Sequence, residues 1–299
     1  MHLVNERASC AADWRLFCPQ SWDDAAAGDP VAAARAAARR KRAGIPDEVR
    51  HREKWRLALE MIDEITGPEG WGVLERAAAA GGGRPVVVAA AGYGDNTTFR
   101  CELSDRGWCY VLAVKGTTSA HASDALPEMT AYGGRGRPSV PRYRSAPVSL
   151  RQLALAHAAE AQPVTWRQGT KAAKGNPTAA MTSTFLAIRV RPANRDIPRA
   201  PDGSLPECWL LAEWPPAADE PTDYWLATLP PDTPIAELVR LAKIRWRIEH
   251  DYRELKTGLG LDHFEGRSWT GWHRHVTLAV LAQAFCTMIR TDPKVPAPG

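Results

Sequence analysis

Charged side chains recur along one stripe of residues 245–256, RWRIEHDYRELK. Four side chains fall within about 60° of arc when residues are placed 100° apart on a helix: Arg245, Glu249, Tyr252 and Lys256. A carboxylate flanked by two cations is suited to holding a divalent metal ion and phosphate oxygens. The alternative is a solvated helix face whose charges form i,i+4 pairs, such as Arg245 with Glu249.

The element that must carry this stripe is a helix with a strong start signal. Thr233 can cap it and Pro234 suits its first position. We therefore expect one helix that begins at Thr233 and includes both Arg245 and Glu249. A last helix is expected over residues 271–290, followed by a proline-rich tail.

A second informative segment is the apolar run of residues 84–90, which is typical of a strand buried on both faces of a sheet. A glycine turn, a short helix and a second apolar strand over residues 108–114 complete a βαβ unit, with Ala90 at its ligand-binding edge. Asp95 or Asn96 can cap the helix, and Asp95 is also close enough to act as a substitute metal ligand. Gly92 and Gly94 form a lone GxG, which more often makes a turn than a phosphate loop.

Positive charge is concentrated between residues 130 and 181. This segment holds eight Lys or Arg against one acid, Glu160, so it carries +7, and the remainder carries −3 of the formal total of +4. We interpret it as a DNA-facing insertion, with these residues as phosphate contacts: Arg135, Arg137, Arg142 and Arg144. The alternative is a loop that is merely solvated. Strand-like alternation follows at residues 164–168, 184–190, 208–213 and 224–228.

Composition places few other limits on the chain. With 299 residues and 44% hydrophobic content it can bury a large core. Six cysteines without a CxxC pair, and no secretory segment, predict free thiols and a cytoplasmic protein. No apolar stretch is long enough to span a bilayer, so no membrane partner is expected.

Several separated motifs resemble DDE-type transposases of bacterial insertion sequences, most closely the "seven-oh-one" branch. Arg245, Glu249 and Lys256 fit the signature Y-x2-R-x3-E-x6-K of the wider group, with Ala242 at the tyrosine position. Further similar motifs occur in the family's order, namely SWDD, AGIP, AGYGDN and GLDHFEGRSWTGWHRH.

The resemblance implies an α/β, ribonuclease-H-like mixed sheet with flanking helices and a β-rich insertion before the catalytic helix. It also implies metal-dependent DNA cleavage and strand transfer at insertion-sequence ends, with three acidic residues holding two Mg²⁺ or Mn²⁺ ions. Glu249 is then the metal ligand, and Arg245 and Lys256 bind DNA phosphate. In domain terms, residues 1–115 are the first part of the core, 116–231 the insertion, 232–292 the C-terminal part of the core and 293–299 a tail.

Two departures from the family pattern change the functional expectation. Ala90 stands where the family has its second aspartate, and a methyl group cannot ligate a metal ion. The strand with the first aspartate should precede MHLVNER, a motif that begins at Met1. We therefore expect an N-terminally shortened, degenerate copy that lacks the first strand and is inactive. The alternative is a non-catalytic remnant that binds DNA, or pairs with itself or an intact transposase.

Overall fold

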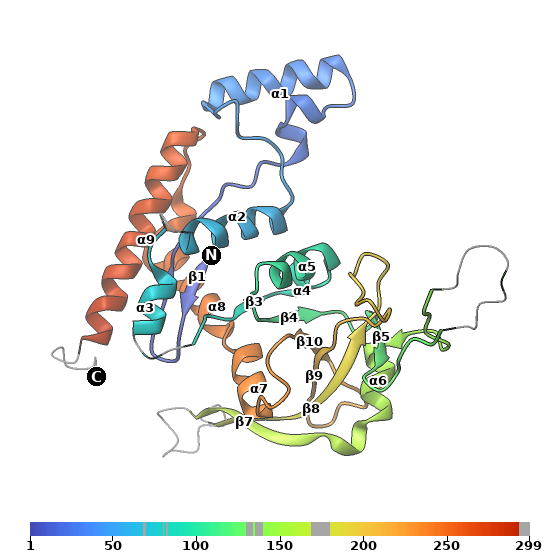
Figure 1. Cartoon of the computed structure of the whole chain (residues 1–299). Helices are drawn as coiled ribbons and strands as arrows, with labels where there is room; N and C mark the ends of the chain where they lie inside the picture. Colours follow the sequence, from blue (N-terminus) through green and yellow to red (C-terminus); the bar gives the residue numbers. More distant parts are fainter. Residues whose placement is uncertain are drawn as a thin grey trace. The chain divides into compact units, whose positions relative to one another are not determined.

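The computed structural model describes residues 1–67, 70–79, 81, 83–129, 134, 140–168 and 180–292. The chain forms two compact units (Figure 1). Unit 1 combines Met1–Val73 with Ile244–Gly299, and unit 2 is Leu74–Lys243. Each unit is built around its own sheet.

Unit 1 pairs two short strands with helices from both ends of the chain. Its elements are β1 (His2–Val4), β2 (Ser9–Ala11), η1 (Gln20–Trp22), η2 (Asp24–Ala26), α1 (Pro30–Ala43), α2 (Lys54–Thr66), α8 (Trp246–Arg253), η5 (Glu254–Gly258), η6 (Leu261–His263) and α9 (Trp269–Thr291). Strands β1 and β2 are antiparallel. Helix α1 follows the expected capping rules, because Asp29 accepts from two backbone amides and Pro30 occupies the first position.

Helix α9 packs on β2 in unit 1. It buries Val276, Ala279 and Gln283, and the Gln283 Oε1 atom accepts a hydrogen bond of 3.2 Å from the Ala11 amide. A buried amide side chain needs such a partner. This contact therefore fixes the helix against the strand.

Unit 2 is an eight-stranded mixed sheet with the order β3-β4-β10-β9-β8-β5-β6, and β7 also pairs with β8. Its strands are β3 (Val87–Ala89), β4 (Tyr110–Val114), β5 (Ser119–Ala122), β6 (Val148–Ser149), β7 (Gln162–Gln168), β8 (Ala180–Pro192), β9 (Cys208–Trp214) and β10 (Asp223–Ala227). Only the β3–β4 pairing is parallel among these described strands. One sheet therefore joins strands from both sides of residue 115.

Helices cover both faces of this sheet (Figure 1). The helices of unit 2 are α3 (Val73–Ala79), which begins at the unit boundary, α4 (Ala91–Gly94), α5 (Thr97–Asp105), α6 (Leu150–Ala156), η3 (Ala158–Glu160) and α7 (Ile235–Lys243). Helix α7 packs Leu238 and Val239 into a core with Val111, Phe185 and Leu211. Alternate residues of a strand point to opposite faces. Leu112 accordingly faces α4 on the other side.

These elements confirm the predicted α/β class with a mixed sheet and flanking helices, as a ribonuclease-H-like fold requires. The predicted βαβ unit is present as parallel strands β3 and β4 connected through α4 and α5. All four strands expected after residue 160 are present. The six cysteines are free thiols. None of the helices in the described part of the chain combines the length and hydrophobicity needed to cross a bilayer.

The prediction of a single helix from Thr233 through Glu249 is wrong. Helix α7 ends at Lys243 and α8 begins at Trp246, so the helix is interrupted at the boundary between the units. Lys243 is held within unit 2, where its ammonium pairs with the buried Glu213 carboxylate and lies 5.5 Å from the Trp225 ring centre. This anchoring fixes the end of α7 in unit 2.

Candidate functional site

Glu249, the expected metal ligand, lies on the first turn of α8. Its side chain is 73% exposed, and its Oε1 atom is 4.0 Å from Arg245 Nη2. The structure thus brings Arg245 and Glu249 together, in the i,i+4 pairing that the sequence also allowed. An exposed pair at this distance contributes little to stability.

Lys256 and Tyr252 depart from the expected stripe. Lys256 lies beyond the end of α8, in η5, whose wider π-helical turn changes the angular spacing of its side chains. The centre of the Tyr252 ring lies 5.1 Å from that of the His2 ring and 5.7 Å from that of the Trp14 ring. The stripe is therefore partly a packing surface of unit 1.

Asp251, two residues beyond Glu249, is buried and anchors α8 to the two-stranded sheet. Its Oδ1 atom accepts a 2.8 Å hydrogen bond from the Ser9 hydroxyl, and its Oδ2 atom lies 3.1 Å from His2 Nδ1. Burial lowers the pKa of His2, the positive chain terminus lowers it further, and Asp251 opposes both effects. This anchor could not be predicted from the sequence, because its two partners lie more than 240 residues away along the chain.

The edge of the sheet at Ala90 shows a backbone turn. The Ala90 carbonyl accepts from the amides of Tyr93 and Gly94, which starts α4 directly after β3. The cap of α5 is Asn96, whose Oδ1 atom accepts from the Phe99 amide at 2.9 Å. The lone GxG is therefore part of a helical turn.

Asp95 has a different role from the helix cap considered above. Its Oδ1 atom accepts from the Lys115 amide at 2.8 Å, and its Oδ2 atom lies 3.4 Å from Lys115 Nζ. Both carboxylate oxygens thus engage the residue that follows β4. This arrangement ties the turn after β3 to the end of the neighbouring parallel strand.

The described residues do not fit the two-cation centre that the resemblance implies. No three His, Cys, Asp or Glu side chains within them gather as ligands for a metal ion. Ala90 offers no ligand atom, and the Glu249 carboxylate is solvent-exposed beside Arg245. Divalent cations of this kind need several oxygen ligands at once.

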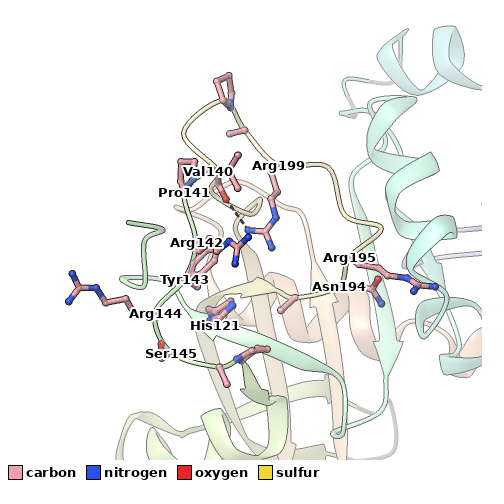
Figure 2. A pocket seen from close by; sticks show the side chains of 16 residues that line it. His121, Val140, Pro141, Arg142, Tyr143, Arg144, Ser145, Asn194, Arg195 and Arg199 are labelled. Carbon is pink, nitrogen blue, oxygen red and sulfur yellow. Dashed lines mark hydrogen bonds between the residues drawn. The ribbon is translucent and has the colours of Figure 1, made fainter. Parts of the chain in front are cut away.

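Unit 2 contains a basic cleft of about 900 Å³, which we call the arginine cleft. Its four charged lining residues are all exposed arginines, and they are Arg142, Arg144, Arg195 and Arg199. None of the described residues that line it is acidic. Figure 2 shows Arg144 and Arg195 at opposite ends of the lining, with Arg142 and Arg199 between them. The positive charge therefore extends along the cleft.

The floor of the arginine cleft is a pair of stacked rings. His121 and Tyr143 lie 4.0 Å apart with 10° between their planes, and the Tyr143 hydroxyl accepts from the Leu205 amide at 2.9 Å. Arg199 lies 5.6 Å from the Tyr143 ring centre and donates to the Gly203 carbonyl at 3.0 Å. Burial lowers the pKa of His121, and the positive charge of Arg199 lowers it further. Both effects favour the neutral form of the His121 ring at the floor of the cleft.

Two of the four arginines predicted from the basic segment reach this cleft. Arg142 and Arg144 line it, and Arg144 also pairs with Glu128 at 2.5 Å. Arg135 and Arg137 lie outside the described residues. Arg195 and Arg199 could not be predicted as phosphate contacts, because they lie some 50 residues further along the chain than Arg144 and outside the basic segment.

The family model of DDE superfamily endonucleases matches residues 1–173, which is more than half of the chain. The chain belongs to this family. Its members act on DNA and generally use divalent metal ions. The matched range contains Ala90, Arg142 and Arg144, and it ends before α8 and Glu249. No curated protein matches the chain significantly.

Proposed function

We propose that this member of the DDE endonuclease family is a transposase-like protein that holds DNA without cleaving it. We propose the ends of an insertion sequence as the DNA that it holds, because the motifs around Glu249 and Ala90 resemble those of insertion-sequence transposases. The observation that carries the proposal is the arginine cleft, which supplies four cations and no acid among its described lining residues. Cations spread along a groove suit a chain of phosphates, since each contact releases a counterion.

We propose that the chain does not cleave DNA because its carboxylates do not form a set of metal ligands. In-line displacement with two cations needs acidic ligands that hold both ions together. Ala90 removes one expected ligand, Asp95 is engaged with Lys115, and Glu249 sits beside Arg245 on a solvent-exposed turn. Binding needs only the arginines, so it survives the loss of a catalytic carboxylate.

Changing Arg142, Arg144, Arg195 and Arg199 together to glutamine tests the cleft. We expect weaker binding to a DNA duplex and a flatter plot of log affinity against log salt. Each lost phosphate contact removes about 0.9 from the slope, so up to about 3.6 is expected for four contacts. Fluorescence anisotropy over a salt series measures both quantities.

A matched control separates the cleft from net charge. Four other arginines pair with nearby acids, namely Arg52, Arg56, Arg106 and Arg240. Changing these four to glutamine alters the net charge equally and should leave most of the slope intact. Equal losses of slope in the two variants would show that DNA does not occupy the arginine cleft.

A further inference from the structure

Helix α9 carries a second apolar face that the described residues of unit 1 leave exposed. One face packs on β2 through Val276, Ala279 and Gln283. On the other face, four large apolar side chains are each 60–68% exposed, and they are Leu278, Leu281, Phe285 and Met288. A helix that is apolar on opposite sides is normally covered on both.

The spacing of this outer face is that of a helix-pairing seam. Leu278, Leu281, Phe285 and Met288 follow each other by three, four and three residues, as the a and d positions of a coiled coil do. They fall within about 80° of arc at 100° per residue. The same stripe continues with Arg274, four residues before Leu278, and with Asp292, four residues after Met288. The seam therefore begins with a positive charge and ends with a negative one.

We propose that this face, the α9 seam, pairs with the α9 seam of a second copy of the chain in antiparallel orientation. A twofold axis that crosses the seam at the height of Gln283 along the helix places Leu278 opposite Met288 of the second copy, and Leu281 opposite its Phe285. The same axis places Arg274 opposite Asp292 of the second copy at each end. Apolar and charged positions are thus self-complementary, as an isologous interface requires.

A parallel pairing lacks this complementarity. It would place Arg274 against Arg274 and Asp292 against Asp292, and like charges at such positions are unfavourable. The charges at the ends of the seam therefore favour a second copy in antiparallel orientation as the occupant.

The exposed area is compatible with a weak dimer. At about 180 Å² for a large side chain, the four residues present roughly 450 Å² of apolar surface in each copy. Two copies can then bury at most roughly 900 Å² from these side chains, and the flanking residues add to it. This is close to the lower limit of about 1,200 Å² for specific interfaces. We therefore expect a dimer that dissociates on dilution.

Sedimentation velocity of the full chain without DNA, over a concentration series, tests the dimer. We expect monomer and dimer in exchange, and Leu281→Glu should weaken dimerisation at least about tenfold by burying a charge in the seam. Val31→Glu is the matched control, because Val31 is a 60% exposed apolar residue on α1. A chain that is monomeric throughout, or a dimer unaffected by Leu281→Glu, overturns the proposal.

A charge exchange tests the orientation independently of Leu281. Arg274→Asp alone and Asp292→Arg alone should each weaken the antiparallel dimer, and the double variant should restore it. In a parallel dimer the double variant keeps like charges together and restores nothing. A dimer indifferent to both charges contradicts the antiparallel seam. Circular dichroism of each variant checks that α9 remains helical.

Discussion

Glu249 and Asp251 are two residues apart on α8 and have opposite surroundings. Glu249 extends into solvent beside Arg245, whereas Asp251 is buried and contacts both Ser9 and His2. The sequence pattern selected Glu249, because a helical stripe of charges is visible in the spacing. It could not select Asp251, whose importance depends on contacts made at the other end of the chain.

Asp251→Ala should destabilise unit 1 by about 2–4 kcal/mol. The substitution leaves the Ser9 hydroxyl without its acceptor and His2 without its carboxylate in a buried setting. Glu249→Ala on the same helix should change the free energy of unfolding by less than about 0.5 kcal/mol. Urea unfolding followed by circular dichroism measures both. A similar cost for the two variants would mean that Asp251 is no anchor.

His121 makes the stability of unit 2 dependent on pH. Its pKa in the folded protein is lowered from 6.5 by burial and by Arg199, so the unfolded chain binds the proton more readily. This contribution to stability is complete above the unfolded pKa. It is lost as the pH falls below 6.5 through the lower folded pKa.

We therefore expect His121→Gln to flatten the loss of melting temperature between about pH 7 and pH 5, relative to the unsubstituted chain. His263→Gln is the control, since the His263 side chain is 76% exposed. Scanning calorimetry at several pH values measures the effect. A pH dependence that is unchanged by His121→Gln but altered by His263→Gln would refute this assignment.

At the scale of elements, the βαβ unit depends on one glycine of the lone GxG. A Cβ atom at Gly94 would collide with the Ala113 carbonyl and lie 3.1 Å from Leu112 Cβ. At Gly92 the same atom would meet nothing within 4 Å. Gly94 thus allows α4 to approach β4 closely.

Gly94→Ala should cost about 2–3 kcal/mol in the free energy of unfolding, because the backbone of β4 cannot move away cheaply. Gly92→Ala should be neutral within about 0.5 kcal/mol, or slightly stabilising in a helical turn. Chemical denaturation of the two variants gives the comparison. Equal effects would argue against close packing of α4 on β4.

The elements also show where sequence reasoning succeeds. Strands β3, β4 and β7 to β10 were predictable because a continuous or alternating apolar pattern reports burial directly. The break between α7 and α8 was not predictable, since Lys243 ends α7 through contacts with Glu213 and Trp225 in distant strands. A capping signal shows where a helix starts, and tertiary contacts decided where this one ended.

At the scale of the whole molecule, the proposed function depends on a site assembled from distant segments. The arginine cleft joins His121, the loop that carries Arg142 and Arg144, and the loop that carries Arg195 and Arg199. The excess of positive charge in the sequence predicted a DNA contact only for the loop that carries Arg142 and Arg144. The family could be inferred from motif order, and the family model confirms it over residues 1–173.

The chain is proposed to bind DNA without cutting it. The most direct measurement incubates the purified chain with supercoiled plasmid in Mg²⁺ or Mn²⁺ and resolves the products on a gel. We expect the protein to slow the migration of the plasmid at low salt. We expect no more nicked or linear product than in the control without protein. Metal-dependent nicking that disappears in Glu249→Gln would contradict it, because Glu249 would then be a working ligand of an active centre.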